Sequence, residues 1–122
     1  MEIYLLFLLF TKHFIVDFPL QWEYQWKNKG TYGHPGGLIH AGLHGIGTYL
    51  CFFWISVPVA VVLAVFDMVV HYHIDWAKMN IARGLTVQDK KYWFWLGFDQ
   101  LIHALTYLAI GISVSFLLTD FI

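Results

Sequence analysis

Residues 58–79 read PVAVVLAVFDMVVHYHIDWAKM, an apolar run that carries ionisable side chains in its second half. A membrane-spanning helix needs about 20 mostly apolar residues, so this run is long enough to cross a bilayer. The chain contains three further runs of this kind, and we predict spans at residues 3–22, 37–56, 58–79 and 93–118. The sequence therefore predicts an all-α, polytopic membrane protein, an antiparallel four-transmembrane-helix bundle that forms a single domain over residues 1–122.

The composition predicts a surface that faces lipid. Of the 122 residues, 59% are hydrophobic and 12% are charged, whereas soluble domains carry about 25% charged residues. The formal net charge is −1 and no basic arm or stripe is present, so we expect membrane lipid and no nucleic acid as a partner. Cys51 is the single cysteine, which excludes an intramolecular disulfide and a CxxC metal motif.

The distribution of basic residues predicts the orientation in the membrane. They gather at the first and third predicted loops, which share one face of an antiparallel four-span chain: Lys27, Lys29, Lys78, Arg83, Lys90 and Lys91. Cytoplasmic loops of membrane proteins are enriched in Lys and Arg. We therefore expect these two loops in the cytoplasm and both termini outside.

Each predicted span contains a pair of polar residues spaced by four. The pairs are His13 and Asp17, His40 and His44, His71 and Asp75, and Asp99 and His103. Residues four apart lie on one face of a helix, one turn apart. Counting from the cytoplasmic end of each span at 1.5 Å per residue predicts two polar layers, at depths of roughly 6–9 Å and 12–15 Å. The deeper layer consists of four histidines, and the shallower layer consists of three aspartates and His40.

These depths are costly for ionisable groups, by at least ~2.5 kcal/mol for each charged side chain on insertion scales. The eight side chains must therefore face inward and satisfy one another or an ion. Imidazole and carboxylate are ligands that Zn, Fe and Mn accept, and four-helix bundles hold two metals with such groups. We predict all eight as candidate ligands of a divalent transition metal (Zn, Fe or Mn), with room for two ions. Two of the eight could instead orient ligands through hydrogen bonds.

Four further polar residues are candidates for catalytic roles beside the metal. Lys12 and Asp67 lie at nearly the same predicted depth, and we expect them to pair because each alone would be unpaired in hydrocarbon. Gln21 and Gln100 lie near the shallower layer, where they could bind substrate or support a ligand. His73, two residues from His71, points away from it and is expected at the membrane interface.

Two features of the backbone also bear on the site. Gly42, Gly45 and Gly47 lie among the histidines of the second span and predict close helix packing there. Pro19 removes a hydrogen-bond donor from the first span and predicts a kink next to Asp17.

The motif HFIVDFPLQ at residues 13–21 resembles a family of proteins with a domain of unknown function, numbered 3307. The resemblance continues through HAGLH at residues 40–44, HYHIDW at residues 71–76 and DQLIH at residues 99–103, so it covers nearly the whole chain apart from residues 30–37. It implies a small four-span membrane protein of bacterial or phage origin, located in the bacterial inner membrane. It implies no established activity.

Several functions fit these features. The first is a metal-dependent enzyme, a hydrolase by preference, acting on a lipid or lipid-linked substrate near the cytoplasmic face, with an oxidative di-iron reaction as a variant. The second is transport or binding of protons or metal ions, for which so few spans favour a homo-oligomer. The third is haem ligation by a pair such as His44 and His103. The fourth is a non-catalytic interaction protein of the phage or host membrane with a structural metal.

Overall fold

The computed structural model describes residues 2–119, which form five α-helices and no strand within that range. Four of the helices are long: α1 (Glu2–Asp17), α3 (Pro35–Phe52), α4 (Val57–Ile81) and α5 (Lys90–Thr119). A short helix, α2 (Glu23–Asn28), lies between α1 and α3. The prediction of an all-α chain is therefore confirmed.

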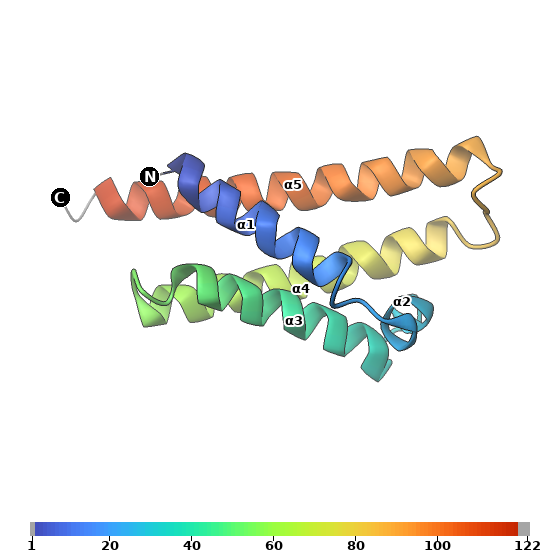
Figure 1. Cartoon of the computed structure of the whole chain (residues 1–122), viewed down its shortest axis with the longest axis horizontal. Helices are drawn as coiled ribbons and strands as arrows, with labels where there is room; N and C mark the ends of the chain where they lie inside the picture. The colour runs from blue at the N-terminus through green and yellow to red at the C-terminus, as the bar shows by residue number, and fades with distance from the viewer. Residues whose placement is uncertain (1, 120–122) are drawn as a thin grey trace.

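The four long helices pack side by side, each running opposite to the helices it contacts (Figure 1). α1 packs against α3 and α5, and α4 packs against the same two helices. α1 and α4 thus occupy opposite corners, and their inward side chains meet across the centre. α2 covers one end of this arrangement and contacts α3. The start of α1 and the end of α5 lie at the other end (Figure 1).

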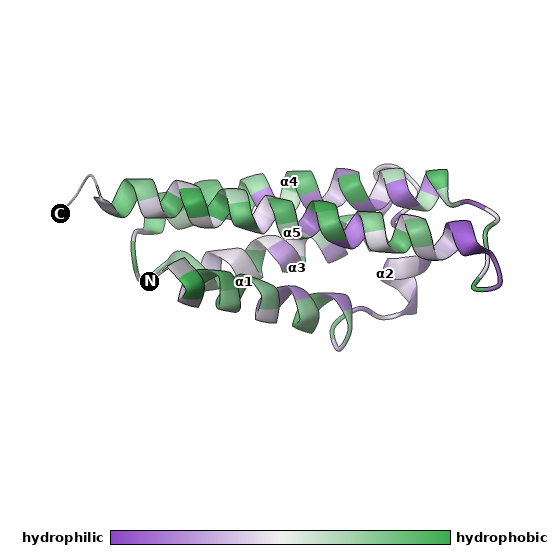
Figure 2. Ribbon diagram, turned by 90° about the horizontal axis from the view of Figure 1, so that it is seen from above, coloured by the Kyte–Doolittle hydropathy of each residue, from purple (hydrophilic) through white to green (hydrophobic). Residues whose placement is uncertain are grey.

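α4 and α5 are long and apolar enough to cross a membrane. With 25 and 30 residues, they extend about 37 Å and 45 Å at 1.5 Å per residue, against a hydrocarbon core of about 30 Å. α1 and α3 are shorter, with 16 and 18 residues. Four membrane spans therefore stay a prediction, while two helices of spanning character are present. Apolar residues dominate both of these helices over most of their length (Figure 2).

The first predicted span is too long by five residues. α1 ends at Asp17 instead of Trp22, and the chain turns over residues 18–20. Pro19 cannot donate a backbone hydrogen bond and disfavours helical geometry in the residue before it, so it ends the helix where a kink was predicted. The second span is displaced as well, because α3 begins at Pro35, with the His34 side chain accepting a bond from the Gly36 N–H at 3.0 Å, and ends at Phe52.

The interior has an apolar half and a polar half. The apolar half lies toward the chain termini and is filled by side chains such as Leu5, Leu9, Phe52, Ile110 and Val114, each no more than 1% exposed. The polar half lies between this core and α2. Apolar packing therefore holds the helices together in one half of the molecule, and the ionisable groups lie in the other half.

The predicted glycine packing is confirmed at two of three positions. A Cβ on Gly45 would lie 3.2 Å from both the Ala64 carbonyl oxygen and the Met68 Cβ of α4, and one on Gly47 would lie 3.1 Å from Lys12 Cδ. At Gly42 a Cβ would meet nothing within 4 Å. Gly42 is therefore not a packing residue in this structure, although it lies one turn from Gly45 in the same helix.

We therefore expect Gly45→Val to destabilise the protein and Gly42→Val to be tolerated. The added side chain at Gly45 must displace the α4 backbone, which costs about 1–3 kcal/mol, whereas at Gly42 only the difference in helix propensity, under about 1 kcal/mol, applies. Thermal unfolding in detergent, followed by helical circular dichroism, measures both. Equal effects of the two substitutions would contradict the packing described for α3 and α4.

Candidate metal centre

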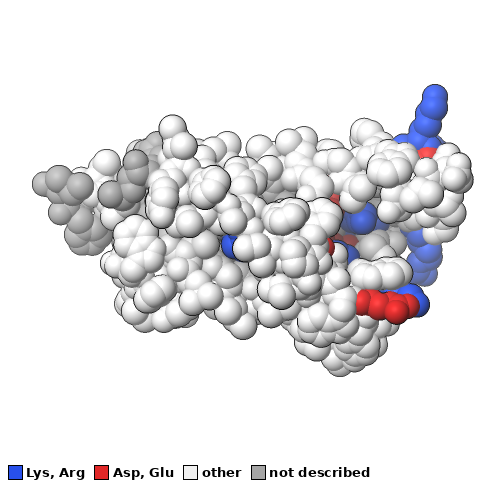
Figure 3. Space-filling model, viewed as in Figure 1, with Lys and Arg blue, Asp and Glu red and all other residues white. Residues whose placement is uncertain are grey.

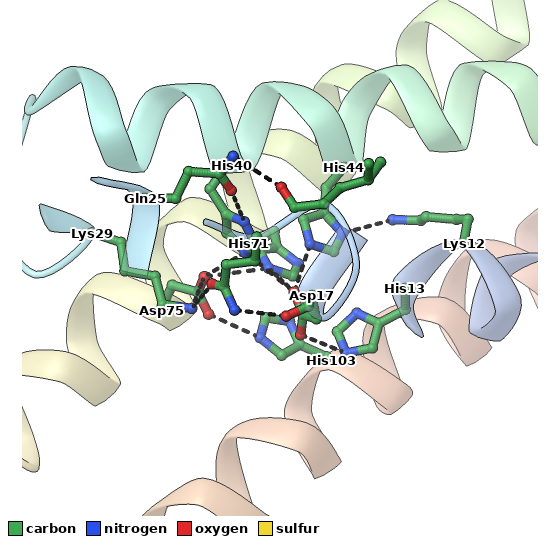
Figure 4. A network of polar contacts seen from close by, with 12 residues as sticks. Lys12, His13, Asp17, Gln25, Lys29, His40, His44, His71, Asp75 and His103 are labelled. Atoms are coloured by element: carbon green, nitrogen blue, oxygen red, sulfur yellow. Dashed lines mark hydrogen bonds and ion pairs between the residues drawn. The ribbon is translucent and has the colours of Figure 1, made fainter. Parts of the chain in front are cut away.

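The four long helices each contribute two side chains to a polar cluster at the centre of the molecule. These are the eight predicted ligands, and each of them is at most 8% exposed: His13, Asp17, His40, His44, His71, Asp75, Asp99 and His103. Figure 4 labels all of them except Asp99 and shows the labelled side chains pointing toward one another from the four long helices. Each helix supplies its pair from positions four residues apart, so both members face inward.

The deeper histidine layer is a compact group of rings. His44 and His71 stack with their ring centroids 3.5 Å apart, and His71 and His103 stack at 4.0 Å. The His13 ring lies 5.4, 5.7 and 5.2 Å from the rings of His44, His71 and His103. Side chains separated by up to 90 residues in the chain therefore share one level, as counting along the predicted spans indicated.

The Nε2 atoms of five histidines face the carboxylates of Asp17 and Asp75. Asp17 lies 3.0 Å from Nε2 of His13, 3.2 Å from that of His40 and 2.9 Å from that of His44. Asp75 lies 3.2, 3.4 and 3.3 Å from Nε2 of His40, His71 and His103. Two sets of ligand atoms lie close enough together to surround an ion: Asp17 with His40, His44 and His71, and His71 with Asp75 and His103.

The hydrogen bonds of His40 leave its Nε2 atom available as a ligand. Gln25 of α2 donates from Nε2 to the Leu20 carbonyl at 3.1 Å, which turns its Oε1 toward His40 Nδ1 at 2.9 Å. Since Oε1 only accepts, Nδ1 of His40 carries the proton, and Nε2 of the neutral ring is a bare lone pair. That lone pair faces the oxygens of Asp17 and Asp75, each 3.2 Å away, and makes no hydrogen bond. A cation placed between these atoms would relieve the repulsion.

His71 is buried without a hydrogen bond on either ring nitrogen. Its side chain is fully enclosed between the rings of His44 and His103. Buried polar groups without a partner are rare in folded proteins and cost about 1–3 kcal/mol each. A ligand role for His71 explains this arrangement, and His71 is the residue common to both sets of ligand atoms.

His44 is placed differently from His40. Its Nδ1 lies 3.1 Å from Lys12 Nζ and its Nε2 lies 2.9 Å from Asp17 Oδ1. An ammonium group only donates, so Nδ1 of His44 accepts from Lys12 and Nε2–H donates to Asp17. His44 therefore orients the Asp17 carboxylate while this contact is present.

His13 and Asp99 lie at the edge of the cluster. His13 Nδ1 lies 2.8 Å from the Tyr107 hydroxyl, and its Nε2 lies 3.1 Å from Gln100 Oε1, so both nitrogens are used in hydrogen bonds. Asp99 contacts His103 at 3.4 Å and accepts a bond from Gln100 Nε2 at 3.1 Å. Neither residue belongs to the two close sets.

The four candidate catalytic residues are all engaged with other side chains or backbone. Lys12 pairs with Asp67 at 2.5 Å, as predicted, and donates to the Tyr107 hydroxyl at 3.2 Å. Asp67 also accepts from Thr48 Oγ1 at 2.6 Å. Gln21 donates to the Asp17 carbonyl at 2.7 Å. Gln100 contacts the side chains of both His13 and Asp99. Gln100 therefore supports the cluster through side chains, and Gln21 supports it through the backbone of Asp17.

The sequence analysis missed two residues that close the cluster on its α2 side. Gln25 is completely buried, and Lys29, assigned to the basic cytoplasmic surface, is 9% exposed and donates to Asp75 at 3.0 Å and to Gln21 at 2.9 Å. Burial alone would lower the pKa of Lys29, but the Asp75 and Asp17 carboxylates raise it above its usual value. Gln21, Gln25 and Lys29 are spaced by four, which is the signal that could have identified them.

Counting charges leaves the buried cluster negative. It contains four carboxylates, Asp17, Asp67, Asp75 and Asp99, and two ammonium groups, Lys12 and Lys29. Lys12 pairs with Asp67, and Lys29 pairs with Asp75. With neutral histidines, two negative charges stay without a counterion, which is the charge that one divalent cation balances.

The described fold and cluster define an all-α protein with a buried centre of histidine and aspartate side chains. The chain belongs to the family described as "Protein of unknown function (DUF3307)", whose family model matches residues 5–121. A search of curated proteins and a search of solved structures found no match. The resemblance noted in the four sequence motifs is confirmed by the family match.

The Lys12–Asp67 pair supports a prediction about stability. Removing one partner leaves the other charge buried and uncompensated, so Lys12→Met and Asp67→Asn should each cost about 3–5 kcal/mol of unfolding free energy. The double variant should cost less than the sum of the two by about 0.5–3 kcal/mol, because the lost pair is counted only once. Chemical unfolding in detergent micelles measures all three variants.

The exposed pair of Glu23 and Lys27 in α2, also spaced by four, provides the control. Its double-variant cycle should give a coupling of no more than about 1 kcal/mol, because solvent screens exposed pairs. Strictly additive effects of the Lys12 and Asp67 substitutions would contradict a direct pair inside the protein.

Proposed function

We propose that this protein is a multi-pass protein of the bacterial inner membrane whose four long helices all cross the bilayer and enclose a divalent metal ion. The arrangement of exposed side chains supports four spans. All described Lys, Arg, Asp and Glu side chains that are not buried belong to residues 23–28 and 78–91, at the end of the molecule that carries α2 and the α4–α5 loop (Figure 3). α1 and α3 expose large apolar side chains, such as Ile3, Phe7, Phe14, Leu38 and Ile46.

The same distribution supports a cytoplasmic location for that end. Its exposed basic residues outnumber its exposed acidic residues, with Lys27, Lys78, Arg83, Lys90 and Lys91 against Glu23 and Asp89. The positive-inside rule then places the described parts of α1 and α5 nearest the chain ends at the outer side of the membrane.

The observation that carries the metal proposal is the Nε2 atom of His40, which is buried without a hydrogen bond between two carboxylates while Nδ1 bonds to Gln25. Metal-binding histidines usually donate their second ring N–H to a carbonyl or carboxylate oxygen in this way. We assign His40, His71, Asp17 and Asp75 as the ligands of one ion, with His103 as the neighbouring donor. The charge balance favours one divalent ion over two, and the donor set suits Zn, Fe or Mn.

The chemistry best suited to this site is hydrolysis of a lipid or lipid-linked substrate near the cytoplasmic face. When bound, the ion would lower the pKa of a coordinated water and polarise a carbonyl or phosphoryl oxygen. The chain's own residues hold and orient the site: His44 and His13 donate to Asp17, Lys29 donates to Asp75, and Gln21 and Gln100 line its partly exposed side. Figure 3 shows charged atoms at the bottom of an indentation on this side, through which water could reach the site.

Transport across the membrane is less well supported. A path for protons or metal ions needs polar groups through the full thickness of the protein. Beyond Lys12 and Asp67, the described interior toward the chain termini is the apolar core of residues such as Leu5, Leu9 and Ile110, each no more than 1% exposed. This core closes the polar cluster on its deep side.

Purified protein should bind about one Zn, Fe or Mn ion per chain, and His71→Ala should reduce that amount to background. His71 is common to both sets of ligand atoms, so its loss removes either site. His73→Ala is the matched control, because the His73 side chain is exposed and bonds to the Val69 carbonyl and to Tyr32. Elemental analysis after metal loading and dialysis measures the content.

Asp17→Asn serves as a second variant of nearly unchanged shape should His71→Ala fold poorly. It should also lose metal, and chelation should lower the melting temperature of the native protein only, since a ligand stabilises the state that binds it. Native protein with no bound metal, or equal metal in the His71 and His73 variants, would contradict the proposal.

Hydrolysis is tested in vesicles of phosphatidylglycerol and phosphatidylethanolamine that contain the purified protein. We expect release of fatty acid, diacylglycerol or phosphate, detected by mass spectrometry, only when Zn, Fe or Mn is supplied, and no release with Asp17→Asn. Lys91→Gln, at an exposed position outside the cluster, should behave as the native protein. Metal-loaded protein that releases none of these products would contradict the assignment as a lipid hydrolase while leaving the metal centre itself intact.

A further inference from the structure

A groove between α4 and α5 leads from the lipid-facing surface to the edge of the polar cluster. It has a volume of about 280 Å³ and lies between the second half of α4 and the first half of α5. Its walls are mostly apolar and formed by Ile74, Ala77 and Ile81 of α4 and by Trp95, Phe98 and Ile102 of α5, and His73 of α4 also lines it. Phe98 and Ile81 are 43% and 54% exposed, so the groove is open along its side.

Asp99 of α5 also lines the groove. Asp99 is 5% exposed, and its Oδ1 atom is buried without a hydrogen bond. The same carboxylate lies 3.4 Å from His103 Nε2, which in turn lies 3.3 Å from Asp75. A molecule in the groove therefore lies one side chain away from the residues assigned to the metal.

The rim of the groove carries a cation without a protein partner. Lys78 lines the groove, is partly exposed, and forms no ion pair with any carboxylate among the described residues. Lys27 and Arg83, at the same end of the molecule, do not line the groove and have protein partners. Lys27 pairs with Glu23, and Arg83 donates to Asn80 at 2.7 Å. Lys78 is thus available to an anion at the end of the molecule that exposes the charged residues.

We propose that this groove binds one anionic phospholipid, with an acyl chain between α4 and α5, the phosphate at Lys78 and the ester region beside Asp99. The apolar walls match the acyl chain, and the unpaired ammonium at the cytoplasmic rim matches the negative head group. Basic pockets between transmembrane helices on the cytoplasmic side bind anionic head groups in this manner. The proposal deepens the proposed function and rests on it for turnover, although lipid binding itself requires no metal.

A second groove between the same two helices provides an internal comparison. It has a volume of 490 Å³ and is lined by Pro58, Phe66, Ala109, Ser113 and other uncharged residues toward the opposite end of the bundle. This groove has space for an acyl chain, but no cation lines it that could bind a negative head group. Selectivity for anionic lipid is therefore expected of the groove at Asp99 alone.

The test measures lipid retained by the purified protein after release from nanodiscs that contain phosphatidylglycerol and phosphatidylethanolamine in equal amounts, by native mass spectrometry. We expect one phosphatidylglycerol per native chain. Lys78→Gln should lower its affinity about fivefold, because one lysine is lost from the site. Ala77→Trp fills the groove and should abolish retention.

Two control variants test whether the loss of lipid is specific to this groove rather than a result of removing any cation or filling any groove. Lys91→Gln removes an exposed cation that does not line the groove, and Ala109→Trp fills the second groove. Both should retain phosphatidylglycerol as the native protein does. Equal retention of both lipids, equal loss in Ala77→Trp and Ala109→Trp, or a dimer that occupies the groove and dissociates in Ala77→Trp would each overturn the proposal.

Metal content measured on the same samples distinguishes this proposal from the proposed function. Ala77→Trp and Lys78→Gln should keep the native metal content, since neither residue is assigned as a ligand. Loss of lipid selectivity with normal metal content supports the groove as a separate lipid site. Native protein that binds metal but retains no lipid overturns the groove alone and leaves the metal centre standing.

Discussion

The structure depends on compensating ionised groups that are buried inside a molecule with an apolar surface. An isolated charge transferred into a medium of low dielectric constant loses solvation worth many kcal/mol, so it must be paired, neutralised or bound to an ion. Here four carboxylates and two ammonium groups lie in the interior, and only two of the carboxylates have an ammonium partner. The histidines around Asp17 and Asp75, and the ion that we propose among them, answer this requirement.

The short helix α2 has a larger part in this arrangement than its length suggests. Gln25 of α2 accepts a hydrogen bond from His40 Nδ1, and Lys29, which follows the last residue of α2, donates to Asp75. The first contact fixes which nitrogen of His40 carries the proton, and the second balances one carboxylate. On the opposite side of the cluster, Lys12 donates to Nδ1 of His44, so the proton of the neutral His44 ring lies on Nε2 instead. Two histidines one turn apart in α3 are thereby placed differently: His44 donates to Asp17, and His40 has the ligand role that we propose.

Helix geometry explains why much of the cluster could be predicted from the sequence. The rise per residue is constant, so counting from a span's end gives depth, and a spacing of four gives one face. These two rules predicted that His13, His44, His71 and His103 lie at one level and that Lys12 pairs with Asp67. The end of α1 was misplaced because Pro19 was interpreted as a kink, whereas the chain turns there and begins a new helix at Glu23.

Other parts could not be obtained in this way. Gln25 was missed because α2 has only six residues, and the spacing by four becomes visible only when Gln21 and Lys29, which lie outside that helix, are counted with it. Lys29 was assigned to the surface because the rule for orientation counts every lysine beside a span, whether or not its side chain turns inward. The protonated nitrogen of each histidine depends on contacts from other helices, which spacing within one helix does not reveal.

The central claim is that the buried charge is balanced by a divalent ion at His40, His71, Asp17 and Asp75. The most direct measurement is anomalous X-ray scattering from crystals of the zinc-loaded protein, collected on both sides of the zinc absorption edge. The account predicts one strong peak about 2.0–2.2 Å from Nε2 of His40 and His71 and from an oxygen of Asp17 or Asp75. Peaks confined to His34 and His73, the two histidines outside the cluster, would contradict it.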